Sequence, residues 1–226
     1  MAPASTDTTT HTTAGAIPNA IPNAIPGAMT GTAATATTTT RRRSMQMTPE
    51  QFRAATGLGE PQCARWFPRL CEAMQAYDIT GTARVAAFLA QTGHESLGYQ
   101  FITHELWGPT PAQALYEPPS RKAMALGNVR AGDGKRFRGR GLIQITGRAN
   151  YSVCGAALGA DLTAAPELLE QDAWAARSAA WWWRTHGCNA LADSGDFIAL
   201  TRRINGGTNG LEDRLRRWKV ATAALS

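Results

Sequence analysis

Two glutamates, Glu95 and Glu105, lie ten residues apart and are the side chains of this sequence best suited to acid–base chemistry. Before Glu95, the apolar residues Val85, Phe88 and Leu89 recur at spacings of three and four, which predicts a helix from residue 82. Glu95 lies one heptad beyond Phe88 and therefore shares the apolar face. Desolvation and the partial negative charge of a helix C-terminus both favour a protonated carboxyl there. A glutamate that keeps its proton near neutral pH can act as a general acid.

Taken alone, Glu95 is more readily interpreted as a helix cap or an ion-pair partner, so the other polar residues must decide. A glycine-rich basic loop ends in Gln144 and Thr146, and Asn205 precedes a Gly-Gly pair. Two acids accompanied by neutral amides and hydroxyls suit glycoside hydrolysis. The sequence shows no histidine-rich ligand set, Walker loop or Gly-x-Ser-x-Gly motif, so we expect neither a metal nor a cofactor. His94 is the helical neighbour of Glu95 and points elsewhere, so we expect it to orient the turn.

Composition divides the chain into two parts. Residues 1–47 are dominated by Thr, Ala, Pro and Gly, and they contain a four-residue repeat of the form Ala-Ile-Pro-Asn. Such a segment cannot bury enough apolar surface to offset its ordering entropy, so we expect a disordered tail. Residues 48–226 suffice for one well-buried core and are expected to form a single catalytic domain.

Helical patterns dominate this domain. Thr48 and Gln51 form a capping box that predicts a short first helix. A second helix is expected over about 61–77, kinked or split at Pro68. Residues 98–143 are rich in Pro and Gly, which predicts a long functional loop with little helix.

The remaining elements are a short strand and four helices. The strand is expected within 139–146, and the helices over 150–158, 172–185, 196–203 and 211–225. Within 172–185, three consecutive tryptophans occupy positions 181–183. Two of them are expected in the core, and the third either packs there as well or stacks on a sugar or a base.

Charge and cysteine usage narrow the function classes. The net charge of +6 favours anionic partners such as nucleic acid, acidic lipid or acidic cell-wall polymer. The four cysteines lack CxxC spacing, so buried reduced thiols are expected. The sequence shows neither a secretory signal nor an apolar run of membrane-spanning length. We therefore expect no membrane insertion, synthesis in the cytoplasm and, for action on a cell wall, release by another route.

Several motifs together resemble glycoside hydrolase family 19, and more narrowly its short bacterial and phage members described as chitinases or endolysins. The resemblance covers about residues 48–225, and its most specific part is the run at 136–144. The motifs are Gln-Thr-Gly-His-Glu-Ser at 91–96, Glu-Leu-Trp-Gly-Pro-Thr at 105–110, the stretch from Gly132 to Thr146, Asn150-Tyr151, and Ile-Asn-Gly-Gly at 204–207.

The resemblance implies a mainly α, lysozyme-like fold of two helical lobes with a catalytic cleft and a short β-like segment. It implies that Glu95 is the general acid and Glu105 the general base of an inverting hydrolysis. Thr146 matches a position that holds the attacking water, and Arg214 matches a cation expected to keep Glu105 ionised. The expected substrate contacts are Gln144, Asn150, Asn205, Trp107 and Tyr151.

The substrate implied is a polysaccharide with β-1,4 links beside N-acetylglucosamine-type sugars, and a monomer is expected to bind it. Thr208-Asn209 replaces an acidic residue of the plant-type members, and their long loops are absent. A shorter, more open cleft would accept a bulkier polymer, so peptidoglycan is favoured over chitin.

Two alternatives stay open. The first is a non-catalytic wall-binding module, against which the retention of both glutamates argues. The second is a nucleic-acid-binding protein that uses the basic loop. For Arg138 and Arg140 of this loop, packing against acidic helix ends is the favoured interpretation, and no nucleic-acid partner is expected.

Overall fold

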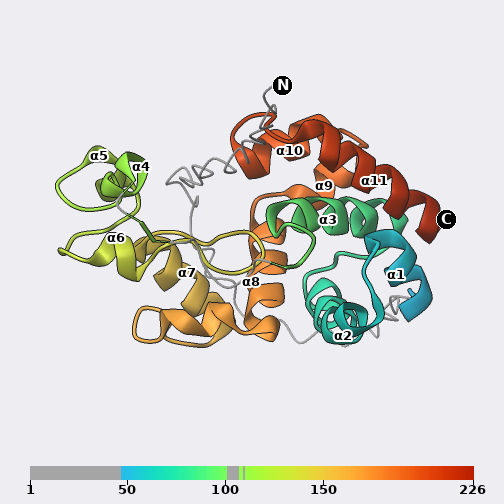
Figure 1. Cartoon of the computed structure of the whole chain (residues 1–226), viewed down its shortest axis with the longest axis horizontal. Helices are drawn as coiled ribbons and strands as arrows, with labels where there is room; N and C mark the ends of the chain where they lie inside the picture. Colours follow the sequence, from blue (N-terminus) through green and yellow to red (C-terminus); the bar gives the residue numbers. More distant parts are fainter. Residues whose placement is uncertain (1–46, 101–106, 109) are drawn as a thin grey trace, which may run out of the picture.

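A computed structural model describes residues 47–100, 107–108 and 110–226. The described residues are mainly helical (Figure 1), and their β pairing consists of one isolated antiparallel bridge between Arg140 and Ile145. The elements are α1 (Pro49–Thr56), α2 (Glu60–Ala76), α3 (Thr82–Glu95), α4 (Pro111–Ala114), α5 (Arg121–Ala125), α6 (Asp133–Arg136), α7 (Arg148–Leu158), the 3-10 helix η1 (Pro166–Glu170), α8 (Asp172–Thr185), α9 (Cys188–Asp193), α10 (Phe197–Asn205) and α11 (Leu211–Leu225). The expected helical class is confirmed.

In the first helix the predicted capping box is confirmed, and in the second helix the predicted possibility of a split at Pro68 is wrong. Thr48 and Gln51 form the predicted capping box, in which each side chain accepts a hydrogen bond from the other residue's backbone N–H. Helix α2, in contrast, runs through Pro68 without a break. Burial on either side of the proline, where Trp66 and Leu70 are fully buried, holds the helix together although one backbone hydrogen bond is missing.

The main core lies among α1, α2, α3, α8 and α11. Helix α3 packs along α11 and also contacts α1, while α2 packs against α8. Small residues such as Ala86 and Ala90 on α3 are fully or almost fully buried and permit this close approach of helices. All three tryptophans at 181–183 are buried, with at most 7% exposure, so the third packs in the core like the two that were expected there.

The segment from residue 107 to 147 forms a separate group of short helices beside α7 (Figure 1). The sequence predicted little helix here, and the helices within the segment, α4, α5 and α6, have only four or five residues each. Thr110 and Ser120 each accept a backbone hydrogen bond as N-caps of α4 and α5. Two carboxylates tie the group together: Glu117 accepts from backbone N–H groups at the start of α6, and Asp133 binds Arg148 of α7.

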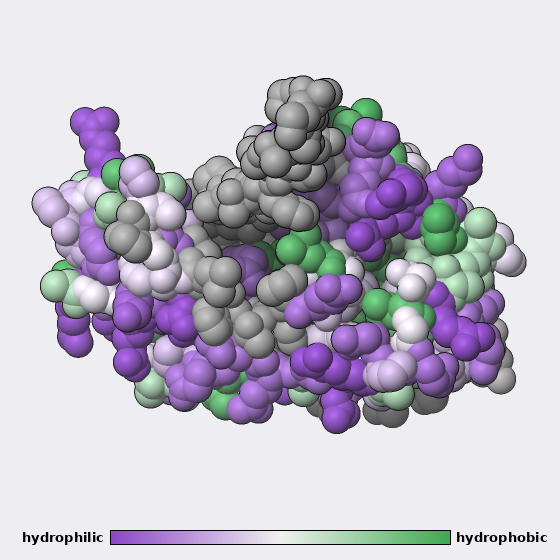
Figure 2. Space-filling model, in the orientation of Figure 1, coloured by the Kyte–Doolittle hydropathy of each residue, from purple (hydrophilic) through white to green (hydrophobic). Residues whose placement is uncertain are grey.

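The described surface and thiols agree with the sequence. Figure 2 shows hydrophilic side chains over most of the described face in this view. Three of the four free cysteines are buried and Cys71 is half-buried. No described helix combines the length and the apolar character needed to cross a membrane.

Candidate active site

Glu95 is the last residue of α3, where the predicted apolar face ends. The helix carries a nearly continuous run of buried side chains from Val85 to Gly93, and this burial fixes the direction in which Glu95 leaves the helix. The Glu95 side chain has no exposed surface. The sequence therefore placed this carboxyl correctly on the buried face.

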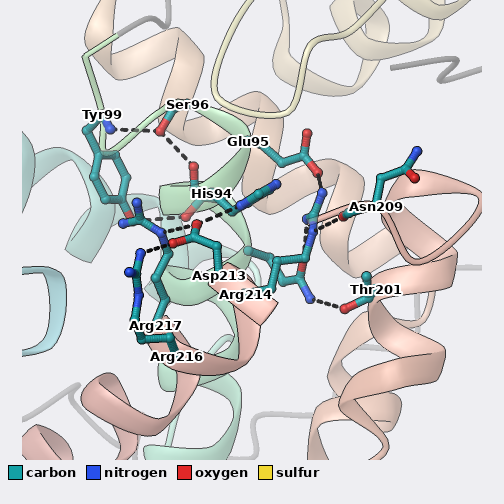
Figure 3. A network of polar contacts seen from close by, with 12 residues as sticks. His94, Glu95, Ser96, Tyr99, Thr201, Asn209, Asp213, Arg214, Arg216 and Arg217 are labelled. Atoms are coloured by element: carbon teal, nitrogen blue, oxygen red, sulfur yellow. Dashed lines mark hydrogen bonds and ion pairs between the residues drawn. The ribbon is translucent and has the colours of Figure 1, made fainter. Parts of the chain in front are cut away.

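The carboxyl of Glu95 meets one cation among the described residues, the guanidinium of Arg214 on α11. An Arg214 Nη2 atom lies 2.5 Å from Glu95 Oε1, and both side chains are fully buried. Figure 3 shows the two groups pointing toward one another from α3 and α11. The contact is an ion pair rather than an aligned hydrogen bond, because neither Glu95 oxygen accepts a hydrogen bond from the described residues. Both carboxyl oxygens of Glu95 are thus free of hydrogen bonds to the described residues.

Three further contacts hold the Arg214 guanidinium in place. Its Nε donates to the backbone carbonyl of Asn209 at 3.1 Å, and its Nη1 donates to Gln91 Oε1 at 2.6 Å. Gln91 lies one turn before Glu95 on the same face of α3, and its own amide donates to Thr201 of α10 at 2.9 Å. Sequence reasoning missed Gln91 and Thr201. A polar residue on the predicted apolar face, four positions before the acid, was the signal that could have found Gln91.

His94 forms a second link between α3 and α11. Its Nδ1 lies 2.7 Å from Asp213 Oδ2, and Arg217 Nε donates to the same oxygen at 2.8 Å. Burial acts to raise the pKa of Asp213, but the hydrogen bonds and charges of Arg217 and His94 outweigh it and lower this pKa to about 2. Because an ionised carboxylate only accepts, Nδ1 of His94 carries the hydrogen. His94 points to Asp213 rather than to the Glu95 carboxyl, as expected.

Three of the other predicted residues share one hydrogen-bonded turn. Thr146 donates through Oγ1 to the carbonyl of Gln144 at 3.0 Å, and Asn150 Nδ2 donates to the carbonyl of Thr146 at 2.6 Å. Gln144 has a positive φ of 57°, and its amide donates to the carbonyl of Gly141. A Cβ at Gly139 would lie 2.5 Å from Gln144 Oε1, so a larger residue there would displace the Gln144 amide. Among the described residues, no hydrogen bond or ion pair joins this turn to Glu95.

The structure corrects the prediction made for Tyr151. It was expected to contact substrate, but its side chain is fully buried and has no surface for a sugar. Its hydroxyl donates to the carbonyl of Arg138 at 2.6 Å and accepts from Arg140 Nη1 at 2.9 Å. Burial, the first of several causes, raises the pKa of this hydroxyl well above its usual value. Tyr151 therefore supports the basic loop from inside.

The basic loop uses most of its arginines for packing. Arg140 Nε donates to Glu170 at 2.7 Å, and Arg138 lies 3.9 Å from the same carboxylate. Arg136 donates to the carbonyls of residues 163 and 164, and Arg148 forms a two-point ion pair with Asp133. The packing interpretation of Arg138 and Arg140 is confirmed.

The last three predicted residues have different outcomes. Asn205 ends α10 with 3% exposure, and its Oδ1 has no hydrogen-bond partner among the described residues. Trp107 is half-buried, and its ring is tilted by 38° against Tyr116 at a centroid distance of 6.3 Å. Glu105 lies outside the described residues, so its role as general base stays a prediction.

The geometry around Glu95 suits proton donation to a leaving oxygen. When a carboxylic acid gives up its proton, it becomes an anion, and the adjacent Arg214 charge stabilises that anion in a buried, low-dielectric place. Gln91 and the Asn209 carbonyl keep the cation from moving away. No group of three or more His, Cys, Asp or Glu side chains in the described part is arranged to hold a metal ion.

Comparison with known proteins identifies the family of this chain. The family described as chitinase class I, glycoside hydrolase family 19, matches residues 62–200. A family 19 domain-containing protein of Haemophilus influenzae is 34% identical over 157 residues, which are 60% of this chain and 76% of that protein. Endochitinase 2 of Gossypium hirsutum is 36% identical over 54% of this chain, but the match spans only 41% of the cotton protein.

Solved structures share the same fold. Chitinase C from Streptomyces griseus superposes with a TM-score of 0.59 and 25% identity, covering 79% of this chain and 76% of that one. The lysozyme-like helical fold expected from the motifs is thereby confirmed. With the family match over most of the folded part and a buried acid at the matched Glu95, the chain belongs to glycoside hydrolase family 19 and is a glycoside hydrolase.

Proposed function

We propose that this enzyme cleaves β-1,4 linkages beside N-acetylglucosamine units in a polysaccharide, with Glu95 as the general acid. The observation that carries the proposal is the buried Glu95 carboxyl, paired with Arg214 and otherwise without hydrogen bonds to the described residues. Chitin is the first candidate substrate, because relatives such as the Gossypium hirsutum protein are named endochitinases.

In the proposed reaction the Glu95 proton moves to the glycosidic oxygen as the bond from that oxygen to the anomeric carbon breaks. Positive charge develops on the sugar ring, and negative charge develops on Glu95 beside Arg214. A water attacks the anomeric carbon from the opposite face and loses its proton to a second carboxylate, which inverts the configuration. Glu105 is the proposed second carboxylate, and Thr146 is proposed to hold the water. Solvent returns the proton to Glu95 after product release.

Peptidoglycan is the second candidate substrate, and the basic character of the chain favours it. A net charge of +6 attracts an anionic wall polymer, whereas chitin carries no such charge. In this version the enzyme acts as a monomer on the wall after release from the cell. The nucleic-acid alternative has lost support, since Arg138, Arg140 and Arg148 form ion pairs within the domain.

The test measures reducing ends released from colloidal chitin and from purified peptidoglycan. Glu95→Gln keeps the size of the side chain but removes the transferable proton, so activity on the true substrate should fall by roughly 10²–10⁴-fold. Glu72→Gln is the matched control, because Glu72 is exposed on α2 and far along the chain from the site. Undiminished activity in Glu95→Gln would overturn the role of Glu95. Binding of both polymers without cleavage by the wild type would favour the wall-binding module.

A further inference from the structure

A chain of hydrogen bonds leads from the α10 backbone to Arg214, and an ion pair joins Arg214 to Glu95. Figure 3 shows the part from Thr201 to Glu95. The Thr201 hydroxyl donates to the carbonyl of Phe197 at 2.9 Å and accepts from Gln91 Nε2 at 2.9 Å. Gln91 Oε1 accepts from Arg214 Nη1 at 2.6 Å, and Arg214 Nη2 contacts Glu95 at 2.5 Å. The three residues that form this chain are fully buried: Gln91, Thr201 and Arg214.

Every link in this chain has one possible direction. A guanidinium only donates and a backbone carbonyl only accepts, so the two ends fix the orientation of everything between them. The amide of Gln91 must present its oxygen to Arg214 and its nitrogen to Thr201. Buried chains of this kind polarise one another and resist rearrangement, because any broken link leaves an unsatisfied polar group.

The charges around the Arg214 guanidinium are few. From α3, Glu95 is its acidic contact, and His94 is engaged with Asp213. From α11, Asp213 is shared between His94 and the arginines Arg216 and Arg217. From α10, the facing side chain is the neutral Thr201. Among the described residues, Glu95 is therefore the acid that balances Arg214, and the other acceptors, the Gln91 amide and the Asn209 carbonyl, are neutral.

We propose that Gln91 and Thr201 are positioning residues that hold the Arg214 guanidinium against the Glu95 carboxyl, where its charge assists proton donation. A neutral acceptor at position 91 leaves the whole Arg214 charge to act on Glu95. This charge stabilises the anion that forms when Glu95 donates its proton. The proposal rests on the proposed role of Glu95.

The decisive variant is Gln91→Glu. The new carboxylate has the size of the amide and accepts from Arg214 Nη1. It also accepts from the Thr201 hydroxyl when that hydroxyl turns from the Phe197 carbonyl toward position 91. The new carboxylate shares the Arg214 charge and repels a second anion at Glu95. Loss of the proton from Glu95 therefore becomes less favourable in this variant. The basic limb of the kcat–pH profile should move to higher pH by about one unit or more. A merely structural role would lower kcat at every pH and leave that limb in place.

Thr201→Val and Thr201→Ser provide the second comparison. Valine removes the hydroxyl that orients Gln91, so the hold on Arg214 weakens, and the basic limb should move in the same direction by a smaller amount. Serine keeps the hydroxyl and should retain the wild-type profile. Thermal unfolding shows whether each variant is folded. If Gln91→Glu does not fold, the Thr201 pair alone decides.

The outcomes separate this inference from the proposed function. One outcome would overturn the positioning role alone. In it, Glu95→Gln loses activity, but the basic limb of the kcat–pH profile stays in place in folded Gln91→Glu and Thr201→Val. Full activity in Glu95→Gln would overturn the proposed function and this inference with it. A shifted limb in Gln91→Glu, with Thr201→Ser unchanged, supports both.

Discussion

At the scale of single residues, Gly210 is the position with the least room for change near the acid. It precedes α11 with a φ of 69°, and a Cβ there would lie 2.3 Å from Cε1 and Nε2 of His94. The His94 ring is hydrogen-bonded to Asp213, so moving the ring away from a new Cβ would break this link between α3 and α11. The sequence shows only a glycine before a helix, so this requirement comes from the structure.

We predict that Gly210→Ala lowers the free energy of unfolding by about 2–4 kcal/mol, the sum of positive-φ strain and overpacking. It should also lower kcat, since α11 carries Arg214. Gly195→Ala is the matched control: Gly195 has a φ of 73°, but a Cβ there meets nothing within 4 Å. The control should lose only about 1 kcal/mol. Urea denaturation measures both variants. An equal loss of unfolding free energy in Gly210→Ala and Gly195→Ala would show that the His94 ring moves aside at little cost.

At the scale of elements, α2 contains a proline that its packing tolerates. Pro68 is exposed and lies well inside the helix, where it removes a backbone hydrogen bond. We predict that Pro68→Ala raises the free energy of unfolding by about 1–2 kcal/mol, because the restored hydrogen bond outweighs the greater freedom of the unfolded chain.

Thermal or urea unfolding measures this effect, and Pro61→Ala gives the comparison. Pro61 lies in the first turn of α2, where no hydrogen bond is lost, so its replacement should bring no gain. A destabilised Pro68→Ala would mean that the helix depends on the proline's bend to place Trp66 and Leu70.

The elements that the sequence predicted are those with long apolar periodicity or a clear cap. Helices α3, α8 and α11 follow from their patterns, and α1 follows from Thr48 and Gln51. The three short helices α4, α5 and α6 could not be predicted in the same way. Each has four or five residues, too few to show a period, and each is stabilised by its surroundings. Continuity of α2 was missed because neighbouring burial outweighs the local effect of Pro68.

The site was predictable where a residue type and its spacing carried the information. Glu95 follows from the apolar stripe. The family resemblance predicted Arg214 near the catalytic acids, but as a partner of Glu105, whereas its described ion pair is with Glu95. The contacts of Gln91 with Thr201 and Arg214 join residues more than a hundred positions apart, and one sequence gives no pattern for such pairs. Tyr151 was misjudged because burial of an aromatic next to a substrate motif has no local signature.

At the scale of the whole molecule, acid should weaken the contacts that hold the group of short helices to α7. Hydrogen bonds from Arg148 lower the pKa of Asp133 to about 2, and backbone N–H groups at 129 and 130 assist. A carboxylate with a depressed folded-state pKa contributes stability above its unfolded value near 4, and this contribution is lost as the pH falls toward 2.

The free energy of unfolding should therefore fall between about pH 4 and pH 2, with about 2 kcal/mol of the fall due to Asp133. Urea denaturation at pH 7, 4, 3 and 2 measures it. Asp133→Asn should be less stable at pH 7 and show a shallower fall in acid. Glu167→Gln, at an exposed position of η1, should keep the wild-type slope. An unchanged slope in Asp133→Asn would show that other groups govern acid unfolding.

The pairing of α3 with α11 has a consequence for how the enzyme is made. A ribosome adding roughly 5–20 residues per second reaches Arg214 about 6–24 seconds after Glu95. During that interval α3 has neither its packing partner nor the cation for its carboxylate. Burying an unpaired anion is costly, so the end of α3 stays in water until α11 arrives. Hydrolytic activity therefore begins only after α11 has been synthesised. Until then, Glu95 of the growing chain lacks the environment in which it acts.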